Sequence, residues 1–357
     1  MDFLLLQKIF SMSQENLTNI STLGEFGLID HLTHDIKLTQ SSTVTGVGDD
    51  AAVLKRNGKQ YTLVSTDLLI EGVHFDMMYT PLKHLGYKSA IVNFSDMAAM
   101  NGLPTQMVVG LGISSKYTLE ALEEFYAGIK KACADYGVDF VGGDTTSSVH
   151  GLFISVTVIG TVDKDKIAYR KGAQKGDLLC VSGDLGGAYM GLLLLEREKK
   201  VFQANPQAQP ELDGKDYILQ RQLKPEARVD VVKALKKAKV VPTSMIDISD
   251  GLASESLHLA KASSLGVAIY EEKIPIDQLT FDTAREFEMV PSVAALNGGE
   301  DYELLFTVAQ ADYDKIKIMP EIRIIGYMTD EAEGNRLITS DGQVIELKAQ
   351  GWDALKK

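Results

Sequence analysis

The sequence is poor in cysteine, with only Cys133 and Cys180 among 357 residues. Both stand in apolar stretches and show no metal-ligand spacing. This excludes a disulfide framework and a cysteine-based zinc site. We expect both thiols to be reduced and buried, as in a cytosolic protein.

Long hydrophobic runs and basic runs are also missing. The four leucines at residues 192–195 fall far short of the roughly 20 residues that span a bilayer. Residues 1–10 contain Asp2 before any basic residue, so we expect no signal peptide and a cytoplasmic protein. The 36 basic and 49 acidic residues give a formal net charge of −13. Such a charge repels nucleic acid and anionic membranes, and we expect neither as a partner.

Several common nucleotide and hydrolase motifs do not occur. The chain contains no G-x-x-x-x-G-K-[ST], H-R-D or D-F-G, which excludes P-loop and protein-kinase sites. It has no H-E-x-x-H, and His74 has no partner pattern for a catalytic triad. The glycines of SGDLGGA at residues 182–188 do not form G-x-G-x-x-G, and they favour a tight turn from a strand into a helix.

The composition of 45% hydrophobic and 24% charged residues is typical of a globular protein. The chain is longer than the size at which single cores stop growing, so we expect two domains. A polar stretch after Val162 is the best candidate boundary. We therefore predict an N-terminal domain at residues 1–165 and a C-terminal domain at 166–357, both mixing helices and strands (α/β).

Hydrophobic periodicity gives the expected elements. It predicts helices at residues 24–34, 87–100, 118–136, 226–238 and 253–263, and a further helix after the glycine-rich turn at 182–188. It predicts strands at residues 61–66, 107–113, 152–162, 178–182, 267–270 and 303–308. Residues 199–226 are polar and read as an irregular connection. The order of the strands cannot be read from the sequence.

Acidic residues stand beside Gly, Ser or Thr in six short segments at predicted strand ends or helix starts. These are GVGDDAAV (46–53), STDLLIEGVHFD (65–76), NFSDMAAMNG (93–102), VGGDTTSS (141–148), IDISDGL (246–252) and NGGEDYELLF (297–306). Any one of them could be an ordinary turn or a helix N-cap. Six in one chain indicate a shared acidic cleft.

Carboxylates in one cleft repel one another, by about 1 kcal/mol per close pair even in water. Asp247 and Asp250 would face the same way at a turn into a helix, whereas Asp49 and Asp50 can share a site only at a strand end or turn. Mg²⁺ prefers oxygen ligands and removes the repulsion. Several such ions could hold the triphosphate of a nucleotide in an acidic protein.

Taken together and in this order, GVGDDAAV, STDLLIEGVHF, YKSAIVNFSDMAAMNG, GGDTT, YRKGAQKGD, DISDGL and GGEDYELLF resemble the thiamine-monophosphate kinases. These belong to an ATP-binding superfamily with aminoimidazole ribonucleotide synthetase, selenophosphate synthetase and a hydrogenase maturation factor. The match runs from Gly24 to Trp352. It implies two mixed α/β domains, a homodimer built through the N-terminal strands, and phosphorylation of thiamine monophosphate by ATP, the final step of thiamine diphosphate biosynthesis.

The resemblance also implies roles for individual residues. The implied magnesium ligands are Asp50, Thr66, Asp67, Asp96, Asp144, Asp247 and Asp250, assisted by Ser65. The implied ATP contacts are Tyr126, Gly143, Asp144, Arg170 and Ser249. The implied thiamine contacts are His74, Glu300 and Trp352, with Asp49 and Asp301 beside site residues. A purely structural role stays open for Tyr126, His74 and Trp352.

The acceptor phosphate has a second pKa near 6 and is mostly dianionic at neutral pH, so direct in-line transfer needs no general base. Mg²⁺ and Arg170 would neutralise the transferring group. Two alternatives stay open: another ATP-using enzyme of the superfamily, of the selenophosphate synthetase or aminoimidazole ribonucleotide synthetase type, and a non-catalytic nucleotide sensor. Neither cysteine matches the reactive cysteine of selenophosphate synthetases, and an ATP consumption assay would identify a sensor.

Overall fold

The computed structural model describes residues 19–351, which fall into two compact units. The described part of the first unit, residues 19–38, holds a short 3-10 turn (Ile20–Thr22) and helix α2 (Gly24–Thr33), as the sequence predicts. The second unit, from residue 39 onward, contains two β-sheets and every other described helix. Trp352 lies outside the described residues.

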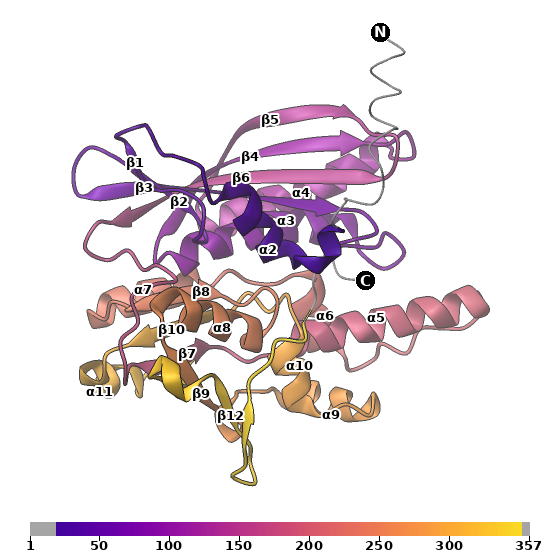
Figure 1. Cartoon of the computed structure of the whole chain (residues 1–357). Coiled ribbons are helices and arrows are strands. Elements are labelled where there is room, and N and C mark those ends of the chain that lie inside the picture. The colour runs from indigo at the N-terminus through magenta and orange to yellow at the C-terminus, as the bar shows by residue number, and fades with distance from the viewer. Residues whose placement is uncertain (1–18, 352–357) are drawn as a thin grey trace. The chain divides into compact units, whose positions relative to one another are not determined.

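The first sheet has six strands in the order β1-β2-β3-β6-β4-β5, antiparallel except for the β4–β5 pair. The strands are β1 (Thr43–Thr45), β2 (Ala52–Lys55), β3 (Gln60–Ile70), β4 (Leu103–Ile113), β5 (Asp139–Ser147) and β6 (Leu152–Asp163). Along β6 every second residue is buried, because successive side chains point to opposite faces of the sheet. Helices α3 (Leu82–Ala99) and α4 (Leu119–Tyr136) contact one face (Figure 1).

Helix α4 shows why its sequence is helical. The Thr118 side chain accepts a hydrogen bond from the Ala121 N–H at the start, and Gly137 ends the helix in the left-handed conformation. Its buried side chains recur at helical spacing. Gly128 packs against α3, where an added Cβ would lie 2.0 Å from the Lys83 carbonyl oxygen. The two helices therefore touch backbone to backbone.

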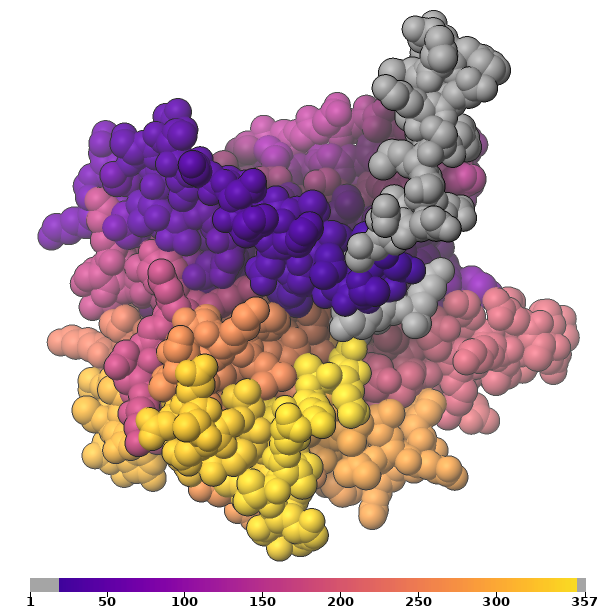
Figure 2. Space-filling model, viewed as in Figure 1, coloured from indigo at the N-terminus to yellow at the C-terminus, as the bar shows by residue number. Residues whose placement is uncertain are grey.

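The second sheet has seven strands in the order β13-β12-β9-β11-β7-β10-β8, antiparallel except for the β12–β9 pair. The strands are β7 (Leu178–Ser182), β8 (Ser244–Asp247), β9 (Gly266–Tyr270), β10 (Leu304–Val308), β11 (Ile322–Thr329), β12 (Arg336–Ile338) and β13 (Val344–Glu346). The helices are α5 (Gly187–Ala204), α6 (Asp216–Leu223), α7 (Val229–Ala238), α8 (Leu252–Ser263), α9 (Gln278–Glu286), α10 (Pro291–Asn297) and α11 (Tyr313–Ile316). Figure 2 shows the yellow C-terminal segment at the surface. Val344 and Ile345 of β13 are exposed.

Helix α3 lies between the two sheets. It contacts β3 and β6 of the first sheet and β8, β10, α6 and α7 of the second half (Figure 1). Fourteen of its eighteen residues are buried, from Leu85 to Ala99. A helix buried on most sides is apolar all round rather than amphipathic. The polar residues that it does carry are therefore significant.

The predicted helices and strands are confirmed, with end shifts of a few residues. The prediction of an irregular connection at residues 199–226 is wrong. Helix α5 continues to Ala204 and α6 fills Asp216–Leu223, because the two helices pack together at Gly191, where a Cβ would lie 2.2 Å from the Ile218 carbonyl oxygen. The GGD segment lies inside β5 rather than at a turn. Both halves mix helices and strands, as predicted.

The first sheet ends at Asp163 and the second begins at Leu178, while the domain boundary at residues 165/166 stays a prediction. Cys133 and Cys180 are free and buried, as expected. Among the described residues, no helix has the length and apolar character needed to cross a bilayer.

Candidate active site

Three aspartates from distant parts of the chain meet between the sheets. Asp50 precedes β2, Asp96 lies near the end of α3, and Asp247 is the last residue of β8. One carboxylate oxygen from each lies within 4.8 Å of the others. Oxygens at this spacing can share one or more hard divalent cations.

Each of the three carboxylates is held on one side by a donor. Arg170 Nη2 donates to Asp50 Oδ1 at 2.6 Å, and Ser95 Oγ donates to Asp247 Oδ2 at 2.5 Å. Ser65 Oγ donates to Asp96 Oδ2. Within the described chain, Asp50 Oδ2 is buried and accepts no hydrogen bond. A buried oxygen without a donor fits a metal ligand.

Burial makes the charge in this cluster unfavourable. It raises the pKa of Asp247 to about 7, with Asp50 adding to the rise, and it raises the pKa of Asp96 well above its ordinary value. Burial likewise raises the pKa of Asp50, although Arg170 opposes the rise, and that of Asp49 to about 6. A divalent cation would keep these carboxylates ionised. The donor set, its burial and its repulsion therefore fit Mg²⁺.

The segment that joins the two sheets is bound to this cluster. The backbone N–H of Arg170 donates to Asp49 Oδ1 at 3.0 Å, while the guanidinium pairs with Asp50. Asp49 thus holds the backbone of Arg170, which belongs to the linker between β6 and β7. Arg170, expected on the phosphates of ATP, stands at the edge of the cluster with its side chain 21% exposed.

The DISDGL and GGED segments lie against each other. Glu300 N donates to Ser249 O at 2.7 Å, and Tyr302 N donates to Ile248 O at 2.9 Å. An added Cβ on Gly299 would lie 2.3 Å from Ser249 O, so this contact requires glycine. Glu300 and Tyr302 have φ of +67° and +53°, a left-handed conformation that is strained for both residue types. Such strain is concentrated at functional sites.

Asp67 and Asp250 lie near the cluster. Asp67 N donates to Asn93 Oδ1 at 3.1 Å, and the Asp67 carboxylate raises the pKa of Asp96. Asp250 N donates to Glu255 Oε1 at 3.1 Å, and burial raises the pKa of Glu255 well above its ordinary value.

Thr66 and Ser249 are exposed. The Thr66 hydroxyl donates to Val156 O at 3.0 Å and, by strand alternation, lies on the sheet face opposite Ser65 and Asp67. The structure therefore does not bring this hydroxyl to the cluster.

Gly143 and Asp144 lie farther away, on the edge strand β5. Asp67 pairs with Val156, Val156 with Val109, and Val109 with Gly143. Three strand spacings of about 4.8 Å put roughly 14 Å between Asp67 and Gly143. Asp144 is exposed, and the structure does not place it in the three-aspartate cluster. Both remain predicted ATP contacts.

A cavity of about 550 Å³ lies beside β5. Tyr126 and Thr145 line it together with apolar side chains. The other lining residues are Leu111, Ile113, Leu119, Leu122, Glu123 and Lys130. Tyr126 packs edge-on against Phe140, at 6.1 Å between ring centroids. An apolar cavity with an aromatic wall can hold a flat base.

His74 lies in the loop after β3. Ile70 N donates to His74 Nδ1 at 3.0 Å, which assigns the remaining proton of the neutral ring to Nε2. Burial lowers the pKa of His74, so the ring is neutral at physiological pH. It is therefore a hydrogen-bonded loop histidine that can also donate through Nε2.

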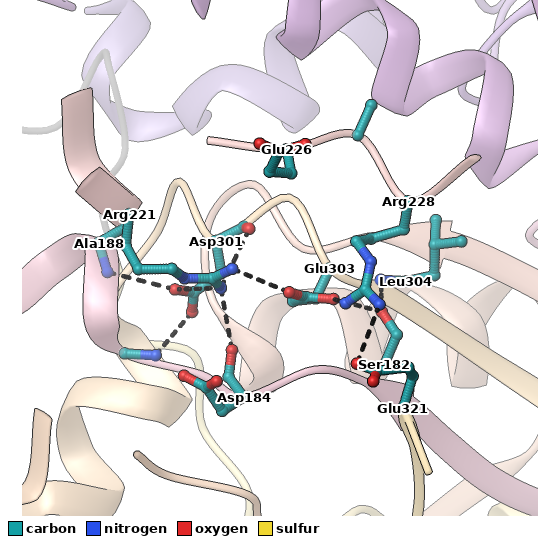
Figure 3. Close-up of polar contacts among 12 residues, drawn as sticks. Ser182, Asp184, Ala188, Arg221, Glu226, Arg228, Asp301, Glu303, Leu304 and Glu321 are labelled. Carbon is teal, nitrogen blue, oxygen red and sulfur yellow. Dashed lines mark hydrogen bonds and ion pairs between the residues drawn. The ribbon is translucent and has the colours of Figure 1, made fainter. Parts of the chain in front are cut away.

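Asp301 has a structural role (Figure 3). It accepts from Gly186 N at 2.7 Å and Ala188 N at 3.4 Å at the start of α5, and it pairs with Arg221 at 3.4 Å. Glu303 pairs with both Arg221 and Arg228 beside it. These contacts fix the GGED segment to α5 and α6.

Sequence reasoning missed several site residues. Lys88 and Gln222 contact Glu300, Ser95 contacts Asp247, and Glu255 contacts the backbone of Asp250. A signal existed for Lys88 and Ser95, which stand seven residues apart in the mostly apolar helix YKSAIVNFSDMAA. Nothing in the sequence marks Gln222.

Comparison with known proteins identifies the family. Residues 48–162 match the AIR synthase related protein N-terminal domain, and residues 174–338 match the corresponding C-terminal domain. Thiamine-monophosphate kinases of Aquifex aeolicus and Bacillus subtilis are 36% and 32% identical to the chain. These matches cover 93% and 94% of this chain and 98% and 100% of the relatives.

Solved structures of related proteins point to the same family and fold. AaThiL complexed with AMPPCP and TMP matches with 31% identity and a TM-score of 0.79, over 95% of this chain and 99% of that one. E. coli HypE, a hydrogenase maturation protein, shares the fold, with 18% identity and a TM-score of 0.66 over 82% and 88% of the two chains. The predicted two-domain architecture of the aminoimidazole ribonucleotide synthetase type is thereby confirmed. The chain belongs to the thiamine-monophosphate kinase family.

Proposed function

We infer that this chain transfers the γ-phosphoryl group of ATP to thiamine monophosphate, which yields thiamine diphosphate and ADP. The observation that carries this function is the buried cluster of Asp50, Asp96 and Asp247, found in a chain whose relatives are thiamine-monophosphate kinases over nearly their whole length. A related structure holds AMPPCP and TMP together. Such a cluster argues against a sensor without catalysis, which an ATP consumption assay would identify.

We propose that Asp50, Asp96 and Asp247 hold Mg²⁺ together with Asp67 and Asp250. Asp144 and Thr66, which lie away from this cluster, would take part only through further ions bound with the nucleotide. Bound Mg²⁺ would neutralise charge on the transferring phosphoryl group. Ser65 and Ser95 orient the carboxylates by donating to them. Arg170 would turn from Asp50 toward the phosphates, since its side chain is partly exposed.

For ATP, the cavity beside Tyr126 supports a place for the adenine ring, with Gly143 and Ser249 on the polar part of the nucleotide. For the acceptor, Glu300 offers a carboxylate and His74 an N–H donor. Trp352 stays a proposed contact. No described side chain is assigned as a general base, because a dianionic phosphate is already a nucleophile.

We also propose a homodimer formed through the first sheet, in the cytoplasm. Edge strand β5 exposes Phe140 and Val141, and β3 exposes Leu68 on the face away from α3. Edge strands and apolar faces of this kind are usually covered in a stable protein. Light scattering after gel filtration should give twice the chain mass, and a concentration-independent mass of about 39.0 kDa would contradict the dimer.

The function is tested by separating the products of ATP, Mg²⁺ and thiamine monophosphate by chromatography. We expect thiamine diphosphate and ADP in equal amounts, and a decline in rate as pH falls through about 6, where the acceptor takes up a proton. Free thiamine should be at least about 100-fold poorer in kcat/KM, because its hydroxyl would need a base. ATP cleavage that leaves thiamine monophosphate unchanged, or equal use of thiamine, would contradict the proposal.

A further inference from the structure

A buried lysine on α3 reaches the second half of the chain. Lys88 Nζ lies 2.9 Å from Glu300 Oε1 and donates to Gln222 O at 3.0 Å. The Lys88 side chain is 5% exposed. An ammonium buried this deeply is unfavourable unless its partners are well placed. The lysine therefore depends on Glu300 and fixes it in turn.

Glu300 is restrained from every side. Gln222 Nε2 donates to Oε2 at 2.7 Å, Lys88 holds Oε1, and the backbone N–H is bound to Ser249 O. The main chain at Glu300 is in the left-handed conformation. Each carboxylate oxygen can accept a second hydrogen bond, and the side chain is 28% exposed. A ligand can thus reach a carboxylate that is already oriented.

Helix α3 connects this carboxylate with the three aspartates. Ser95 stands seven residues after Lys88, on the same helical face, and donates to Asp247. At 1.5 Å per residue, the two contacts are separated by about 11 Å along the helix. An extended acceptor with its phosphate at the aspartates would bring its other end to Glu300.

We propose that Lys88 is a positioning residue for the acceptor: together with Gln222 it holds the Glu300 carboxylate oriented toward the thiamine end of thiamine monophosphate. This inference rests on the proposed function. The thiamine end carries a permanent positive thiazolium charge and an amino group that donates hydrogen bonds. A carboxylate that is held in one orientation fits both features.

The test replaces Lys88 by methionine, which keeps the length of the side chain and removes its charge. We expect KM for thiamine monophosphate to rise at least about tenfold, while KM for ATP stays within about twofold. Lys83→Met on the same helix is the control, because Lys83 is exposed, and it should leave both constants unchanged. Thermal unfolding and far-UV circular dichroism of Lys88→Met verify that the fold is retained.

A second variant separates positioning from simple stabilisation. If Lys88 acts through Glu300, Lys88→Met should change the acceptor KM by less than about twofold when it is introduced into Glu300→Gln. Removing both charges also avoids an unpaired buried group, so the double variant stays testable if the single one unfolds. An equal rise in KM in both backgrounds, or no rise in either, overturns the inference. If the wild-type protein forms no thiamine diphosphate at all, the proposed function itself is wrong.

Discussion

Asp96→Asn is expected to lower phosphoryl transfer at least about 100-fold, which corresponds to about 2.7 kcal/mol of transition-state stabilisation. Asparagine keeps the shape of the side chain and its hydrogen bond from Ser65, but it lacks the negative charge that a shared cation requires. The effect should appear in kcat, measured as thiamine diphosphate formed at saturating ATP and Mg²⁺. Wild-type turnover by this variant would remove Asp96 from the metal site.

When no metal is present, Asp96→Asn should not destabilise the fold and should tend to stabilise it. Asp96 lies close to Asp50 and Asp247 in the wild-type protein, and their mutual repulsion is lost when one becomes neutral. In a chelator the variant should therefore melt at or above the wild-type temperature. Added Mg²⁺ should stabilise the wild-type protein and have little effect on the variant. Asp165→Asn, at an exposed linker position, should behave as wild type in both measurements.

Arg170→Met should affect both folding and activity. Removing one member of a buried ion pair leaves the other uncompensated, at a cost of about 3–5 kcal/mol. Asp50 is only 2% exposed and Arg170 21%, so we expect the lower end of this range, about 3 kcal/mol in the free energy of unfolding. Transfer should fall at least about tenfold, because an arginine near the phosphates also stabilises charge in the transition state.

Two comparisons sharpen this prediction, both by urea unfolding. Lys317→Met breaks an exposed pair with Asp314 and should leave the unfolding free energy nearly unchanged, because water screens such pairs. Asp50→Asn combined with Arg170→Met should recover part of the lost stability without recovering activity. Equal losses from the Arg170 and Lys317 changes would show that the Arg170–Asp50 pair is not structurally important.

Local patterns were enough to predict part of the elements, among them α3 and β6. The buried run in α3 and the alternation in β6 follow directly from residue periodicity, and the acidic segments pointed to Asp50, Asp96 and Asp247. How these residues meet could not be predicted, since β8 and α3 are brought together by long-range packing that leaves no local pattern. The exposed, glycine-rich β5 carries no alternation that would mark a strand.

Polar residues whose partners lie far away were missed for the same reason. Lys88 is marked by its apolar surroundings in α3, but its pairing with Glu300 spans more than two hundred residues. Gln222 belongs to α6, a helix that the polar composition of residues 199–226 concealed. Only its packing against α5 makes that segment helical.

The attachment of the linker to the first sheet has a consequence for how such a protein can evolve. Asp49 and Asp50 come from the first half, whereas Arg170 and Asp247 come from the linker and the second half. A recombination event that replaced either half would separate these charges and leave unmatched carboxylates or an unmatched guanidinium at the junction. We therefore expect the two halves to be inherited as a pair, and new specificity to arise in the loops around the junction rather than by exchange of whole domains.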